Sequence, residues 1–208
     1  MKLTKKVNAY LPFTASTMVD YSNFSRFFYE LGMLRRVQRE GWKLIGITHP
    51  ESVAEHSLRA AQIAYVLAKL EHHPSPETVC SMLVFHDMGE SRIGDIQKVA
   101  NKYVSSDERK AVSDQLHSLE EIGQDIFQLW DEIELNESKT GIIGKDADLL
   151  ELALTACEYK KLGFIAAEDW LIKTKQRIKT NSAQKLLNSF VETDPMEWWD
   201  GLKKLEKK

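Results

Sequence analysis

Two histidines lie at positions where a solvent-exposed histidine is not expected. His56 has helical spacing from the apolar residues of VAEHSLRAAQIAYVLAKL, and His86 has the same relation to those of SMLVFHDMGE. A lone inward histidine is most often a hydrogen-bonded core residue. Two on successive helices, one followed directly by Asp87, favour a site instead, because imidazole nitrogen and carboxylate oxygen are common ligands of divalent transition metals.

Further acids lie close to this pair in the sequence. Glu90 is four residues after His86, and hence on the same side of a helix. Asp95 follows a glycine just beyond the expected helix end; the alternatives for these two acids are a solvated helix end and an ordinary turn. The apolar stretch KDADLLELAL also contains Asp146 and Asp148, and an acid buried there needs a partner or a cation. Periodicity does not separate these two, because apolar residues flank both.

The elements that must position these residues are predicted to be helices. Glycine (10) and proline (5) are scarce, and no run alternates polar with apolar residues. We expect one all-α domain over residues 1–208, with a core at about 20–165 and C-terminal helices in 166–208. The apolar spacing and cap signals predict helices over 22–38, 50–71, 76–88, 105–122, 124–134, 139–161, 168–179 and 195–207.

The charge balance limits the partners. The 28 basic and 31 acidic side chains give a net charge of −3, which argues against a nucleic-acid polymer or an anionic membrane as the main partner. Cys80 and Cys157 show no CxxC spacing, and neither a signal peptide nor an apolar run of membrane-spanning length is visible. We therefore expect a cytoplasmic protein that binds a small anionic metabolite.

Four segments together resemble the HD-domain metal-dependent phosphohydrolases. They are GW at 41–42, PESVAEH at 50–56, FHDMGESRIGDI at 85–96 and KDADLLELALTACEY at 145–159. More narrowly, the chain is similar to the branch of the bacterial YfbR-type 5′-deoxynucleotidases and the eukaryotic HD domain-containing protein 2. The resemblance covers about residues 20–165. It implies a helical HD domain, a homodimer, and hydrolysis of (deoxy)nucleoside 5′-monophosphates to nucleoside and phosphate.

The resemblance also implies a set of metal ligands. It assigns His56, His86 and Asp87 to one divalent ion. The fourth ligand is Asp148 rather than Asp146, because the family's last ligand falls four residues before the position of Leu152. Ligands of this kind suit Mn, Fe, Co, Ni or Zn better than Mg.

The remaining site residues are carried over in the same way. Glu90 matches the acid that activates the attacking water, and Asp95 matches a second carboxylate that contacts substrate or nucleophile. Trp42 matches a tryptophan that helps to select the 5′-deoxynucleoside. Gly41 stands where the bacterial enzymes have a basic residue, and Arg39, three residues before Trp42 as in the eukaryotic branch, is the candidate for binding phosphate.

Three other functions are compatible with a protein that resembles this family. A dinuclear HD enzyme, either an oxygenase or a cyclic-dinucleotide phosphodiesterase, has two more histidines between the HD pair and the last Asp. Only His117 lies there, among acids and polar residues that indicate an exposed position. A non-catalytic regulatory or nucleotide-binding HD module would be expected to lack Glu90 or a ligand. A phosphohydrolase of this fold could also act on a triphosphate or a cyclic nucleotide.

Overall fold

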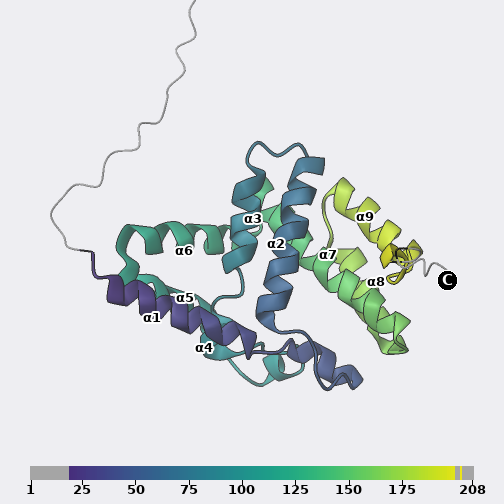
Figure 1. Cartoon of the computed structure of the whole chain (residues 1–208), viewed down its shortest axis with the longest axis horizontal. Helices are drawn as coiled ribbons and strands as arrows, with labels where there is room; N and C mark the ends of the chain where they lie inside the picture. Colours follow the sequence, from purple (N-terminus) through teal and green to yellow (C-terminus); the bar gives the residue numbers. More distant parts are fainter. Residues whose placement is uncertain (1–18, 200–201, 203–208) are drawn as a thin grey trace, which may run out of the picture.

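The computed structural model describes residues 19–199 and 202 of the 208-residue chain. Within these residues the only β-type pairing is an isolated bridge between Gln38 and Ser52, so the expected all-α class is confirmed. No helix in the described ranges has the length and apolarity needed to cross a membrane. The α-helices in this part of the chain (Figure 1) are α1 (Tyr21–Leu31), α2 (Val53–Leu70), α3 (Pro76–Phe85), α4 (Glu90–Ile93), α5 (Glu108–Leu116), α6 (Glu120–Leu135), α7 (Lys139–Lys161), α8 (Glu168–Arg177) and α9 (Asn181–Glu192).

Helix α7 is the central element, since it contacts α2, α3, α6, α8 and α9. In Figure 1, α2 and α3 lie side by side, with α8 and α9 on one side of them and α1, α5 and α6 on the other. Ala60 and Ala64 of α2 and Ala147 of α7 are fully buried in the shared core. Such small side chains let two helices approach closely, which brings one face of α2 up to α7.

A second group of buried apolar residues packs around α1, α5 and α6. Met88 belongs to this group and lies two residues after His86. The segment that follows α3 is therefore anchored by its own apolar contact, immediately next to the predicted site. The members of this group are Phe27, Met88, Val112, Leu116, Leu119, Ile126 and Trp130.

Two helix starts differ from the sequence-based expectation because another residue forms the cap. Helix α2 begins at Val53 rather than at position 50, since the Ser52 side chain caps it in a reciprocal capping box with Glu55. The capping box expected between positions 105 and 108 is wrong. The Asp107 carboxylate instead accepts the Lys110 N–H, and α5 begins at position 108.

Two predicted helices end early because a 3₁₀ turn follows each. The helix expected over 22–38 ends at Leu31, and a 3₁₀ turn occupies Gly32–Arg35. The helix expected to reach 122 ends at Leu116, because a 3₁₀ turn at His117–Leu119 intervenes. As a result α6 begins at Glu120 and not at 124. The longest predicted helix, 139–161, has the expected bounds.

The C-terminal part of the chain differs most from the prediction. Helix α9 was not predicted; the Thr180 side chain caps it, and it buries Ala183 and Leu187. The described part of the helix expected over 195–207 contains only a 3₁₀ turn, Glu197–Trp199. Residues 200–201 and 203–207 of that prediction lie outside the described residues.

Candidate metal centre and active site

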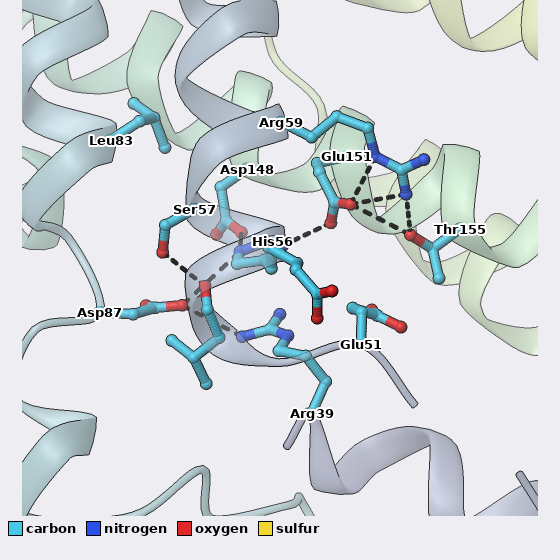
Figure 2. Close-up of polar contacts among 12 residues, drawn as sticks. Arg39, Glu51, His56, Ser57, Arg59, Leu83, Asp87, Asp148, Glu151 and Thr155 are labelled. Carbon is cyan, nitrogen blue, oxygen red and sulfur yellow. Dashed lines mark hydrogen bonds and ion pairs between the residues drawn. The ribbon is translucent and has the colours of Figure 1, made fainter. Parts of the chain in front are cut away.

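The four predicted metal ligands meet at one place, although they come from three separate parts of the chain. His56 lies in the first turns of α2, His86 and Asp87 directly follow α3, and Asp148 lies in the middle of α7. The Nε2 atoms of the two histidines are 3.3 Å apart. Asp87 Oδ2 lies 3.1 Å from Nε2 of His86 and 3.5 Å from that of His56. Asp148 Oδ1 lies 3.3 Å from Nε2 of His56, which Figure 2 shows beside both carboxylates.

The Nδ1 atom of each histidine forms a hydrogen bond on the side of the ring away from the other ligands. His86 Nδ1 donates to the backbone oxygen of Leu83 at 2.9 Å. His56 Nδ1 donates to a carboxylate oxygen of Glu151. Because a carbonyl and a carboxylate can only accept, each Nδ1 carries the proton. Each Nε2 is then the nitrogen that points into the site, which is the arrangement of metal-ligating imidazoles.

The sequence analysis missed the charged residues behind His56. Glu151 is buried, and its other oxygen accepts from Arg59 Nε at 2.9 Å and from the Thr155 hydroxyl at 3.1 Å. Figure 2 shows Arg59 beside Glu151 and Thr155. Arg59 also donates to Glu158 at 2.7 Å. One available signal was the position of Glu151 three residues after Asp148, on the same side of α7.

The ligand carboxylates are ionised. Burial acts to raise the pKa of Asp148, but Lys145, with Nζ 3.0 Å from Oδ2, and the two histidines hold it well below its usual range. Burial opposes ionisation of Asp87 as well, and there His86 and Arg39 outweigh it. Arg39 Nη1 lies 3.1 Å from Asp87 Oδ2. The two cations that stabilise these carboxylates therefore also line the site.

Glu90 and Asp95 line the same cavity as the ligand carboxylates, but they differ from each other in their hydrogen bonds. One buried oxygen of Glu90, Oε2, has no hydrogen-bond partner among the described residues. Burial, followed by the charges of Asp87 and Asp95, raises the pKa of Glu90 to about 9. Asp95 Oδ2 accepts the backbone N–H of Glu40 at 2.9 Å, and burial raises its pKa. A carboxyl group with a raised pKa and an unused oxygen in a cleft has the properties of a proton-transfer group.

A cavity of about 460 Å³ opens from the ligand cluster, a size typical of small-molecule sites. Its inner part is lined by Arg39, Asp87, Glu90, Asp95 and Asp148. An apolar wall follows, formed by Trp42, Leu44, Leu149, Leu152 and Trp170. Four further basic residues line the cavity and were not predicted from the sequence: Lys98, Lys145, Lys173 and Arg177.

Trp42 lines this cavity from the 3₁₀ helix Glu40–Ile45, which the sequence analysis did not predict. Its ring stacks on Trp170 with centroids 5.0 Å apart and meets Tyr159 edge to face at 5.1 Å. Its indole N–H donates to Glu51 at 2.8 Å. Trp42 is 1% exposed and its polar atom is bonded to Glu51, so the small part of the ring that reaches the cavity is apolar.

The structure separates the two acids that periodicity left open. Asp146 is buried, and its carboxylate accepts the backbone N–H groups of Lys179 and Thr180, at 3.0 and 2.7 Å. It thereby holds the start of α9. Asp148 is the acid of this pair that faces the histidines.

The donor set fits one divalent transition ion. His56, His86 and Asp148 each offer a ligand atom within 4.8 Å of the others, and Asp87 contacts both histidines. Two imidazole nitrogens and two carboxylates are ligands that such ions prefer over Mg²⁺. His117, which the dinuclear alternative would require, is exposed in the 3₁₀ turn His117–Leu119 and does not belong to this cluster.

Comparison with known proteins decides the family. The family model described as "HD domain" matches residues 31–189, which include every residue of the cluster. The chain belongs to the HD-domain family. The HD pair itself is His86-Asp87.

Relatives within the HD-domain family include two proteins named 5′-deoxynucleotidases. One, HDDC2 of Dictyostelium discoideum, is 33% identical over 150 residues, which are 67% of this chain and 79% of the relative. The other, from Photobacterium profundum, is 31% identical over 185 residues, which are 81% of this chain and 94% of that relative. The crystal structure of the PH0347 protein from Pyrococcus horikoshii superposes with a TM-score of 0.65 at 27% identity, covering 81% of this chain and 98% of that one.

Proposed function

We propose that this HD-domain protein is a metal-dependent phosphomonoesterase that hydrolyses deoxynucleoside 5′-monophosphates to nucleoside and phosphate. The observation that carries the proposal is the convergence of two imidazole nitrogens and two carboxylates at the inner end of one cavity. The relatives named 5′-deoxynucleotidases support the choice of substrate.

In this proposal His56, His86, Asp87 and Asp148 hold one divalent transition ion. Candidates are Mn, Fe, Co, Ni and Zn. When bound, such an ion supplies positive charge to a phosphoryl group that would otherwise repel a nucleophile, and it acts as a Lewis acid.

The chain's own groups then handle the proton and the phosphoryl oxygens. Glu90 would act as the base in its ionised form, which the positive charges of the bound ion and of Arg39 favour over the protonated form that burial stabilises without the ion. In that form it takes the proton of the attacking water, and Asp95 orients that water from the oxygen that Glu40 does not occupy. The water oxygen bonds to phosphorus as the bond to the 5′-oxygen breaks. The 5′-oxygen leaves as a hydroxyl, taking up one proton for the one that Glu90 accepted. Arg39 donates to the remaining phosphoryl oxygens.

Trp42 is proposed to form the wall against the sugar. Its ring presents no hydrogen-bonding atom to the cavity, because its N–H is bonded to Glu51. A 2′-hydroxyl placed against this wall would lose its hydrogen bonds to water without gaining a partner, which disfavours ribonucleotides.

A release assay for phosphate tests the proposal. Wild type should release phosphate from deoxynucleoside 5′-monophosphates with an added divalent metal. Glu90→Gln should lower that rate by about 100-fold or more. Glu77→Gln, an exposed acid at the start of α3, is the matched control and should leave it unchanged. Turnover only of triphosphates or cyclic nucleotides would assign another activity, and no turnover despite bound metal would indicate a regulatory or nucleotide-binding module.

The setting of the enzyme is also proposed. We infer a single domain over residues 1–208 that works in the cytoplasm as a homodimer and binds neither nucleic-acid polymers nor membranes. The net charge of −3 supports the last point. Light scattering of the purified protein should give twice the chain mass of 23.9 kDa. A mass of one chain would contradict the homodimer.

A further inference from the structure

Three cations lie at the rim of the cavity, away from the metal ligands. Lys173 and Arg177 are one turn apart on α8, and Lys98 lies in the segment between α4 and the 3₁₀ turn Ala100–Lys102. All three line the cavity and are exposed. In the part of the chain that the structure describes, none of them forms an ion pair with a carboxylate.

These cations are close enough to repel one another. Burial lowers the pKa of the Lys98 ammonium, and the charges of Arg177 and Lys173 lower it further. Lys173 Nζ also lies 5.9 Å from the centre of the Trp170 ring, which forms part of the apolar wall. Clustering like charges without acidic partners costs free energy in the empty cavity, and a bound anion would recover it.

A buried polar group follows Lys173 on α8 and lines the same cavity. Thr174 is 1% exposed, lines the cavity between Lys173 and Arg177 in the sequence of α8, and its hydroxyl has no hydrogen-bond partner among the described residues. Buried hydroxyl groups are nearly always hydrogen-bonded. An unsatisfied donor beside three cations is the combination that a phosphate-sized anion satisfies.

The cavity lining therefore contains an apolar wall and two groups of cations that differ in exposure. At the inner end are the metal ligands, Arg39 and Lys145; at the rim are Lys98, Lys173 and Arg177. A nucleobase or a deoxyribose alone would leave the rim cations unpaired.

We propose that Lys98, Lys173, Arg177 and Thr174 form a second anion subsite, and that the preferred substrate is a nucleotide with a second phosphoryl group on the sugar, away from the one hydrolysed. The inference rests on the proposed function for the identity of the inner group. With such a substrate the same hydrolysis gives a nucleoside monophosphate in place of the nucleoside that a 5′-monophosphate gives, and the phosphate that this product keeps lies at the rim.

Equilibrium binding tests this subsite without turnover. In a Glu90→Gln background loaded with metal, the affinities of deoxyadenosine 3′,5′-bisphosphate and deoxyadenosine 5′-monophosphate are compared by calorimetry at fixed ionic strength. The bisphosphate should bind about tenfold more tightly or better, the effect of one good charge-assisted contact. Adding Lys173→Gln and Arg177→Gln should reduce the ratio of the two dissociation constants, monophosphate over bisphosphate, to about 1. Lys175→Gln with Lys185→Gln removes the same charge from exposed positions on α8 and α9 and should leave the ratio unchanged.

Two results would overturn the subsite. Equal affinity for both nucleotides in the starting protein would show that the rim does not bind a second phosphate. Equal weakening of both nucleotides by the rim substitutions would show general electrostatic attraction instead. Neither depends on hydrolysis, so a failure of the proposed function appears separately, as absent phosphate release by the wild type.

Discussion

Glu151→Gln should weaken metal binding although Glu151 is not among the proposed ligands. One oxygen of this buried carboxylate accepts the Nδ1–H of His56, and the other accepts from Arg59 and Thr155. Glutamine has one oxygen and one NH₂ group, so a donor must face either the His56 N–H or the Arg59 guanidinium. The substitution therefore loses one of the two contacts and the negative charge that makes the His56 ring a stronger ligand.

The size of both effects follows from these contacts. Loss of the carboxylate behind a ligating imidazole lowers metal affinity by about 10- to 100-fold. Leaving one buried donor unpaired lowers the free energy of unfolding by about 1–3 kcal/mol. For a chain of this length, that corresponds to a drop in melting temperature of about 2–12 °C.

Competition with a fluorescent chelator measures the metal affinity, and a thermal melt of the metal-free protein measures the stability. Glu158→Gln is the matched control, because Glu158 bonds the same Arg59 at 2.7 Å, has no hydrogen bond to His56 and has a side chain that is 42% exposed. This control should keep the wild-type metal affinity, and its free energy of unfolding should fall by less than about 1 kcal/mol. Wild-type affinity in Glu151→Gln, or equal weakening in both variants, would refute the positioning of His56 by Glu151.

The remaining predictions concern the ligands and the packing of α7. Asp146→Asn should lower the melting temperature, because two backbone N–H groups at the start of α9 lose their charged acceptor, yet keep the metal content of wild type. Asp148→Asn should lose the metal. Excess metal should raise the melting temperature of wild type but not of His86→Ala, since a ligand that binds only the folded state stabilises it. Gly141→Ala should lower the free energy of unfolding by about 2 kcal/mol or more, because the new Cβ would lie 2.4 Å from a backbone oxygen of α6. Gly32→Ala is the control: the nearest atom to its Cβ would be 3.5 Å away, so the stability should hardly change.

The helical class and the inward histidines could be predicted because both depend on apolar periodicity. His56 and His86 are 0% and 2% exposed, as their spacing indicates. The helix ends were less accurate because several nearby residues could cap each helix, and local sequence does not decide among them. Helix α9 did carry a signal that the prediction passed over: Thr180 as a cap, followed by Ala183 and Leu187 at helical spacing.

The site could be predicted only where its residues share a local pattern. Asp146 and Asp148 are two residues apart, about 200° around the helix, so they face different neighbours in the fold. Which one meets the histidines depends on how α7 packs, and periodicity contains no such information. The same applies to Lys173 and Arg177, whose spacing is that of any solvated helix face; only the position of α8 beside the cavity distinguishes them. The catalytic and ligand roles themselves stay predictions.

Phosphate release from deoxyadenosine 5′-monophosphate during metal titration shows whether hydrolysis depends on one ion bound at the histidine and aspartate cluster. The protein is first stripped with a chelator and then titrated with Co²⁺ or Mn²⁺, beside Asp148→Asn. We expect no release from the stripped protein, a rise that levels off at one ion per chain, and no recovery in the variant. Release that does not depend on metal would contradict the proposed mononuclear site, and so would a plateau at two ions per chain, which would indicate a dinuclear enzyme.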